Sequence, residues 1–171
     1  MTVTVETGLW QLDPTASAVT VRHKTFWGLL TVKGTFAGVT GRGEVSADGT
    51  ATGTLAIDAA SLDTGHKKRD DHLRSADFFD VANHPEITFA VRGAKRSAGD
   101  AVQVDGQLTV RGISRPQQVT AQLVSADADG LTLEAEFTVV REEFGVSMNQ
   151  MRMMGGPTTV TATLRFTRAA A

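Results

Sequence analysis

The chain has 171 residues, a formal net charge of -2 and no cysteine. This length suits one domain with a sizeable core, so we expect residues 1–171 to form a single domain. The lack of cysteine excludes disulfides, cysteine-based zinc sites and a thiol nucleophile. No block of Lys and Arg favours a nucleic-acid partner or an anionic membrane surface.

The start of the chain, residues 1–6, is polar and β-branched, without a cationic start, an apolar core or a small-residue cleavage site. No run approaches the roughly 18 apolar residues that a membrane span needs. The sequence therefore predicts no signal peptide and no membrane span, and we expect a cytoplasmic protein.

Apolar residues recur at every second position along most of the chain, which is typical of β-strands. A first strand at Trp10 and Leu12 stops at Asp13-Pro14. Further alternation is expected over 19–24, 32–36 and 55–57, and Ala47-Asp48-Gly49 is typical of a tight turn. His23 falls on the apolar face of its strand.

The segment 69–89 departs from this pattern. A short charged helical turn comes first, followed by the adjacent aromatic residues Phe78 and Phe79. Pro85 prevents a helix from continuing, and Ile87 and Phe89 start a new alternating strand. A helix, an aromatic pair and a strand in an otherwise all-β chain indicate a lid or plug over a sheet.

The second half alternates more regularly. Strands are expected over 102–111, 119–123, 131–139 and 160–166, with a turn at Ala128-Asp129-Gly130. About eight strands with short connections favour antiparallel neighbours, and a closed eight-stranded antiparallel barrel leaves no exposed edge. A two-sheet sandwich is the alternative architecture.

Small and large residues are mixed on the expected inner face. The small ones are Gly34, Gly106, Ala121, Ala135 and Ala162; the aromatic ones are Phe36, Phe89, Phe137 and Phe166. They could leave a channel for a slender ligand, or interdigitate into a solid core. The sequence leaves both possibilities open.

Candidate reactive residues are few. The four histidines form no HExxH or HxH pair, so no metal site is predicted, and no GxSxG motif, phosphate loop or carboxylate pair in an apolar context indicates an enzyme. A histidine on an apolar face is either a core residue with one hydrogen bond or a polar contact in a ligand channel. Arg69 or Arg74 could reach an anionic head group over the barrel mouth.

Five stretches together resemble the YceI-like family. They are Trp10 to Pro14, Arg69 to Asp80, His84 to Phe89, Gly106 to Gly112 and Arg141 to Gly145. The resemblance covers nearly the whole chain in the right order. One departure is that the family usually has His-Ser after Asp-Pro, where this chain has Ala16-Ser17, so any role of that histidine is absent. A second is the missing signal peptide, since many members are exported.

The resemblance implies a lipocalin-like antiparallel barrel with a short helix near one end. It also implies a long-chain apolar ligand such as a polyprenyl chain, an isoprenoid quinone or a similar lipid, a homodimer, and no established catalytic activity. We therefore predict a binding, storage or transport protein with no cofactor other than a bound polyisoprenoid or quinone. The alternatives are a ligand-free dimeric stress-response interaction module and, behind it, a lipocalin-like enzyme.

Two sets of residues are predicted to contact such a ligand. Apolar side chains that would pack on the tail are Phe26, Trp27, Phe36, Phe78, Phe89, Phe137, Met148 and Met151. Polar side chains that would hold the head group are His23, Arg69, His72 and Arg74.

Overall fold

The computed structural model describes residues 7–25, 30–75, 79–126, 129–140 and 158–168. The described residues form eleven strands, one α-helix and short 3-10 turns. In chain order these are β1 (Gly8–Leu12), η1 (Pro14–Ala16), β2 (Ala18–Thr25), β3 (Leu30–Phe36), β4 (Val39–Val45), β5 (Ala51–Asp58), η3 (Ala59–Ser61), β6 (Leu62–Asp63), α1 (Lys67–Arg74), β7 (Glu86–Arg96), β8 (Ala101–Val110), β9 (Ile113–Ala126), β10 (Gly130–Val139) and β11 (Thr158–Arg168).

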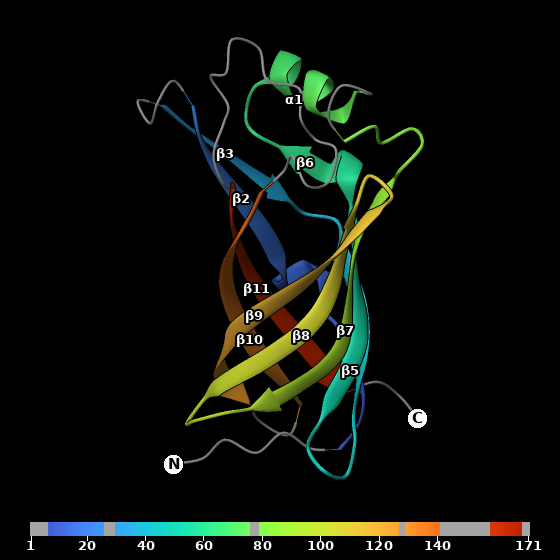
Figure 1. Ribbon diagram of the computed structural model, residues 1–171, viewed down its shortest axis with the longest axis vertical. Coiled ribbons are helices and arrows are strands. Elements are labelled where there is room, and N and C mark those ends of the chain that lie inside the picture. Colours follow the sequence, from blue (N-terminus) through green and yellow to red (C-terminus); the bar gives the residue numbers. More distant parts are fainter. Residues whose placement is uncertain (1–6, 26–29, 76–78, 127–128, 141–157, 169–171) are drawn as a thin grey trace.

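Eight of these strands close into an antiparallel barrel, as the sequence predicted. The ring runs β1-β4-β5-β7-β8-β9-β10-β11 and returns to β1, which pairs with both β4 and β11. The remaining strands, β2, β3 and β6, extend the sheet from β11 toward the end that carries α1 (Figure 1). A two-sheet sandwich is thereby excluded.

The break between β1 and β2 has a local cause. Asp13 accepts hydrogen bonds from the backbone N–H of Thr15 at 3.0 Å and from its hydroxyl at 2.7 Å. With Pro14 at the first position, this capping turns the chain through η1. The first strand thus ends at Asp13-Pro14 as predicted, and both β1 and β2 pair with β11.

The predicted turn at Ala47-Asp48-Gly49 joins β4 to β5. The carboxylate of Asp48 accepts hydrogen bonds from the Ser46 hydroxyl at 2.6 Å and from the Thr50 N–H at 2.9 Å. Gly49 has φ +86°, in the left-handed region that glycine enters without strain. The second predicted turn, at Ala128-Asp129-Gly130, falls partly outside the described residues.

Alternation along the strands sorts side chains as expected. On β10 the residues Glu134, Glu136 and Thr138 are exposed, whereas Leu131 is buried and Ala135 and Phe137 face the interior. The helix α1 lies across one end of the barrel, and the β7–β8 hairpin lies at the other (Figure 1). The barrel axis therefore has two chemically different ends.

Candidate binding cavity

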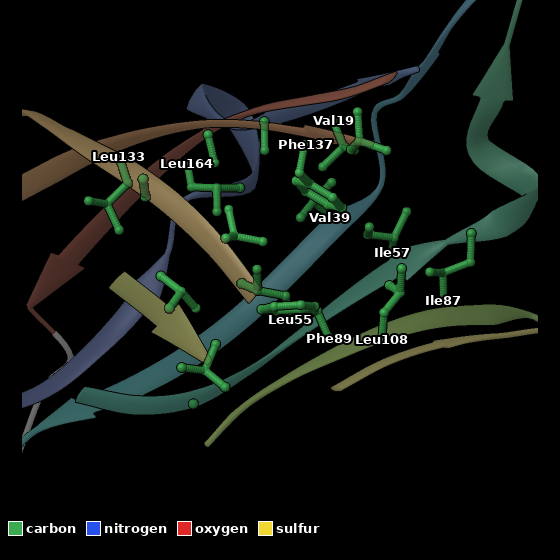
Figure 2. A pocket seen from close by; sticks show the side chains of 18 of the residues that line it. Val19, Val39, Leu55, Ile57, Ile87, Phe89, Leu108, Leu133, Phe137 and Leu164 are labelled. Atoms are coloured by element: carbon green, nitrogen blue, oxygen red, sulfur yellow. The ribbon is translucent and has the colours of Figure 1, made fainter. Parts of the chain in front are cut away.

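The barrel interior contains a partly open cavity of about 560 Å³. Aliphatic and aromatic side chains from all eight ring strands border it. Figure 2 labels ten of the lining residues around a common space, nine from the ring and Val19 from β2. This volume lies within the usual range of ligand pockets, roughly 300 to 1,000 Å³. The interior is therefore large enough for a small or slender molecule.

Inward-facing side chains retain accessible surface, which a solid core would not allow. Val21, Leu55, Val91, Val104 and Phe137 all border the cavity, yet each is only partly buried. In a barrel filled to the density of a protein interior these positions would be among the most buried. Of the two possibilities that the sequence left open, a channel is what the described residues form.

Part of the interior is nevertheless filled where small residues face large ones. A Cβ on Gly34 would lie 2.7 Å from Cδ1 of Leu62, and one on Gly106 would lie 2.6 Å from Cζ of Phe89. These glycines therefore make room for neighbouring side chains. Gly34, Leu62 and Phe89 themselves border the cavity, so this packing narrows it without filling it.

A polar group enters the cavity near α1. His23 on β2 is only 8% exposed and stands opposite Thr158 in the β2–β11 register. Its Nδ1 lies 2.9 Å from the Thr158 hydroxyl oxygen, a hydrogen bond whose donor depends on the histidine tautomer. Thr64 and Arg69 also border the cavity at this end.

The helix α1 is held to the segment before it by charged side chains. Asp70, which is buried, accepts hydrogen bonds from the Thr64 N–H at 3.0 Å and from the Thr64 hydroxyl. Arg69 donates from Nε to the Thr64 hydroxyl at 2.8 Å and from Nη2 to the Thr64 carbonyl at 2.9 Å. Arg74 donates to the carbonyls of Ala60 at 3.0 Å and Leu62 at 2.7 Å.

These contacts fix the protonation of Asp70. Burial by itself would raise the pKa of this carboxyl, but the hydrogen bonds from Thr64 and the nearby charges of Arg74 and Arg69 outweigh burial and lower the pKa below 3.8. Asp70 is therefore a carboxylate at neutral pH. Its charge stabilises the connection between α1 and Thr64.

An aromatic contact links the residue after this helix segment to the barrel wall. Phe79, which follows α1, meets Phe36 edge to face, with ring centroids 6.0 Å apart and planes at 87°. Leu73 of α1 borders the cavity beside them. Such an aromatic pair adds about 0.5 to 1.5 kcal/mol beyond area burial.

A separate apolar cluster lies toward the end of the barrel away from α1. Trp10, Leu123 and Leu131 are 4%, 3% and 6% exposed and form its centre. The guanidinium carbon of Arg168 lies 5.3 Å from the centroid of the Trp10 ring, within reach of a cation–π interaction. The three central side chains also border the cavity.

The predicted contact residues are distributed unevenly over this geometry. Phe36, Phe89 and Phe137 border the cavity, and so do His23 and Arg69. His72 is exposed on α1 and does not border it, and Arg74 points to backbone carbonyls. The predicted residues Phe26, Trp27, Phe78, Met148 and Met151 lie outside the described part of the chain.

Some residues that line the cavity were not predicted as contact residues from the sequence. Thr64, Thr158, Leu123 and Leu131 border the cavity but had no distinguishing signal, because threonine and leucine are common on every strand. Trp10 was noted only as part of a first strand and of a family motif. Its position in the cavity wall follows from the β1–β11 pairing.

The described residues contain neither a metal-binding cluster nor a membrane-spanning helix. No group of three or more His, Asp or Glu side chains there could hold a metal ion. Over the same residues, α1 is too short and too polar to cross a bilayer, and no other helix is long and apolar enough to do so.

Comparison with known families gives one match over most of the chain. The model of the YceI-like domain matches residues 10–166. Among curated relatives, a UPF0312 protein of Pectobacterium atrosepticum is 34% identical over 98 residues, which cover 54% of this chain and 50% of that protein. Protein YceI of Escherichia coli O157:H7 is 39% identical over 75 residues, covering 44% of this chain and 39% of the relative. The matched segments thus span half or less of these relatives.

Solved structures share the fold at lower sequence identity. Burkholderia cenocepacia BcnA superposes with a TM-score of 0.81 at 21% identity, covering 90% of this chain and 98% of that one. A polyisoprenoid-binding domain from Saccharophagus degradans gives a TM-score of 0.73 at 18% identity, covering 94% and 98%. At these identities the likeness establishes the fold.

Proposed function

Because this chain belongs to the YceI-like family, we propose that its barrel binds one long-chain apolar molecule, a polyprenyl chain, an isoprenoid quinone or a similar lipid. The observation that carries the proposal is the apolar cavity of about 560 Å³ bordered by partly buried side chains. The polyisoprenoid-binding domain from Saccharophagus degradans, which has the same fold, supports the same ligand class.

Burial of the tail supplies the affinity. Each methylene moved from water into an apolar site contributes about 0.8 kcal/mol. A tail packed on Phe36, Phe89 and Phe137 therefore binds well without specific polar contacts. The same proposal extends to the predicted tail contacts Phe26, Trp27, Phe78, Met148 and Met151.

We place the head group at the α1 end. His23 and Thr158 supply a hydrogen-bonding pair inside an otherwise apolar wall, and Arg69 borders the cavity near the same end. Such a polar group in an apolar pocket orients a ligand more than it strengthens binding. His72 and Arg74 were predicted for the same role; the contacts of Arg74 with Ala60 and Leu62 favour a structural role for that side chain.

This geometry favours binding over catalysis, and storage or transport of the ligand follows from it. A homodimer belongs to the same proposal, since the resemblance to the family implies one. Light scattering coupled to size-exclusion chromatography tests the dimer independently of the ligand.

Native mass spectrometry of the purified protein tests the proposal. We expect an apolar ligand on the wild-type protein, released by organic solvent, or taken up from an added polyprenol. Ala135→Trp places a large ring in the cavity and should abolish binding, whereas Glu134→Trp puts the same ring on the outer face and should not. Thermal unfolding confirms that both variants fold. Lack of ligand uptake by the wild type, or equal uptake by Ala135→Trp, contradicts the proposal.

A further inference from the structure

The cavity extends along the barrel from one end to the other. Arg69 and Leu73 of α1 border it at one end, and Gly49 and Arg96 border it at the opposite end. Gly49 lies in the turn between β4 and β5, and Arg96 is the last residue of β7, where the β7–β8 hairpin turns. In the part of the chain that the structure describes, a single space therefore reaches both ends of the barrel.

Two paired glycines leave part of the cavity wall without side chains. Gly43 on β4 stands directly opposite Gly53 on β5, and both border the cavity. A Cβ added to Gly43 would have one neighbour within 4 Å, the backbone oxygen of Thr52 at 3.1 Å. Trp10 pairs with Gly43 in the β1–β4 register, yet its indole does not cover the glycine. Here the cavity is bounded by backbone alone.

The next residues toward the end away from α1 have small side chains. Val45 stands opposite Ala51, and Ala51 stands opposite Ala94 on β7. All three border the cavity and are only partly buried. Ala51 and Ala94 pack against neither apolar cluster of the described residues. The small side of the wall therefore continues from the glycines to the β4–β5 turn.

The bulky residues at this end lie on the other side of the interior. In the ring of strands, β4 and β5 lie across from β9 and β10. Leu123 on β9 and Leu131 on β10 are the buried residues there. They narrow the interior from one side only, so a path remains along β4, β5 and β7.

Arg96 is held to its own hairpin at the rim of this path. Its Nη2 donates to the Gly99 carbonyl at 2.9 Å and to the Asp100 carboxylate at 3.1 Å. Both partners belong to the β7–β8 turn. The guanidinium is therefore fixed beside the opening by local contacts and not by a partner on the opposite wall.

We propose that the tail of a long ligand passes over Gly43 and Gly53 and leaves the barrel between the β4–β5 turn and the β7–β8 hairpin. This inference rests on the proposed function, which puts the head group at the α1 end, and it adds that the barrel accepts tails longer than itself. The part of the tail beyond Ala94 lies outside the wall and stays in the detergent or lipid that supplied the ligand. Only the part inside gains contacts with the protein.

Cysteine labelling tests where the tail runs. Because the chain has no cysteine, Ala94→Cys supplies a single thiol beside the cavity, and Lys95→Cys supplies the matched control on the outer face of the same strand. Each variant is loaded in detergent with farnesol, a short prenol, or solanesol, a long one. A charged maleimide then labels the thiol, and mass spectrometry follows the rate. Solanesol should slow labelling of Ala94→Cys several-fold and farnesol should not; neither should affect Lys95→Cys.

A blocking variant tests whether this path is needed. Ala94→Trp places a large ring in the opening, and forcing a tail past it resembles overpacking a core, so solanesol should bind on the order of tenfold more weakly. Farnesol should bind as it does to the wild type, because its tail ends before the opening. Lys95→Trp carries the same ring on the outer face and should leave both affinities unchanged. Native mass spectrometry measures binding, and thermal unfolding verifies that the variants fold.

The outcomes separate this inference from the proposal on which it rests. If the wild type binds neither prenol, ligand binding itself is wrong and the inference falls with it. If farnesol binds and solanesol does not, the barrel is closed at this end and the inference alone is wrong. It is also overturned if farnesol protects Ala94→Cys as well as solanesol does, if solanesol gives no protection, or if Ala94→Trp weakens both prenols equally or neither.

Discussion

Thr158 stands directly opposite His23 in the β2–β11 register, and its hydroxyl oxygen lies 2.9 Å from Nδ1 of the imidazole. The pair borders an apolar cavity, and His23 is almost completely buried. Buried polar groups are costly unless they are hydrogen-bonded. Thr158 therefore both supports the imidazole and fixes its orientation toward the interior.

His23→Leu should weaken binding of a prenol more than binding of the hydrocarbon with the same tail. One lost hydrogen bond costs about 1 kcal/mol, or roughly fivefold in affinity. Competition against a fluorescent fatty probe measures both affinities, and Thr158→Val should act in the same direction. Equal losses for the prenol and the hydrocarbon would mean that His23 contributes by packing alone.

Asp70→Asn should destabilise the fold by about 1 to 3 kcal/mol, because the Thr64 N–H and hydroxyl lose a charged acceptor. The pKa of Asp70 is lowered in the folded protein, so its contribution is complete above the unfolded pKa near 3.8 and is lost as the pH falls below it. In urea unfolding, the free energy of unfolding of the wild type should therefore exceed that of the variant at neutral pH. The two values should become equal in strong acid.

Asp71→Asn is the control for that measurement. Asp71 is an exposed carboxylate that pairs with Lys67 at 3.7 Å and Arg74 at 3.3 Å, not with the backbone. Exposed ion pairs contribute little, about 0 to 1 kcal/mol. If Asp71→Asn destabilised the protein as much as Asp70→Asn, the assignment of Asp70 as the main carboxylate that holds α1 to Thr64 would be wrong.

Arg74→Lys distinguishes a structural arginine from one that holds a head group. Lysine keeps the charge but cannot reach the carbonyls of Ala60 and Leu62 with the geometry of a guanidinium. We expect faster amide hydrogen exchange over α1 and unchanged prenol affinity. A clear loss of affinity with unchanged exchange would instead support the head-group role that the sequence suggested.

Gly106→Ala should destabilise the barrel by roughly 1 to 3 kcal/mol. Its new Cβ would lie 2.6 Å from Cζ of Phe89 and 2.8 Å from the backbone oxygen of Ala90, and the backbone cannot move aside cheaply. Gly93→Ala on the paired strand β7 is the matched control, because nothing lies within 4 Å of its added Cβ. Thermal unfolding measures the change in unfolding temperature for each variant. An equal decrease in both would contradict the packing argument.

Much of the barrel was predictable because period-two alternation is a local property. The inner positions of β7, β8 and β10, such as Phe89, Leu108 and Phe137, were assigned correctly from their neighbours alone. The helix was predicted in the right part of the chain because the charged run before the aromatic pair breaks the period-two alternation; it ends at Arg74, well before Pro85. What remained open was whether the interior is solid, since that depends on which residues face each other across the barrel.

The details of the site depend on register, which the sequence does not encode locally. Thr158 is 135 positions from His23, and nothing near either residue indicates that they pair. Asp70 and Arg74 are four residues apart, a spacing that permits an ion pair on a helix; instead Asp70 accepts hydrogen bonds from Thr64, and Arg74 binds carbonyls and Asp71. Helical spacing permits several partners for Asp70 and Arg74. The partners that they have depend on the position of the segment Ala60 to Thr64 beside the helix.

The most direct measurement of the central claim is electron density inside the barrel of protein purified from cells or soaked with a prenol. The account predicts elongated density between Phe89, Phe137 and Val104, with its polar end near His23. An interior occupied by the protein's own side chains, without room for a tail, would contradict it.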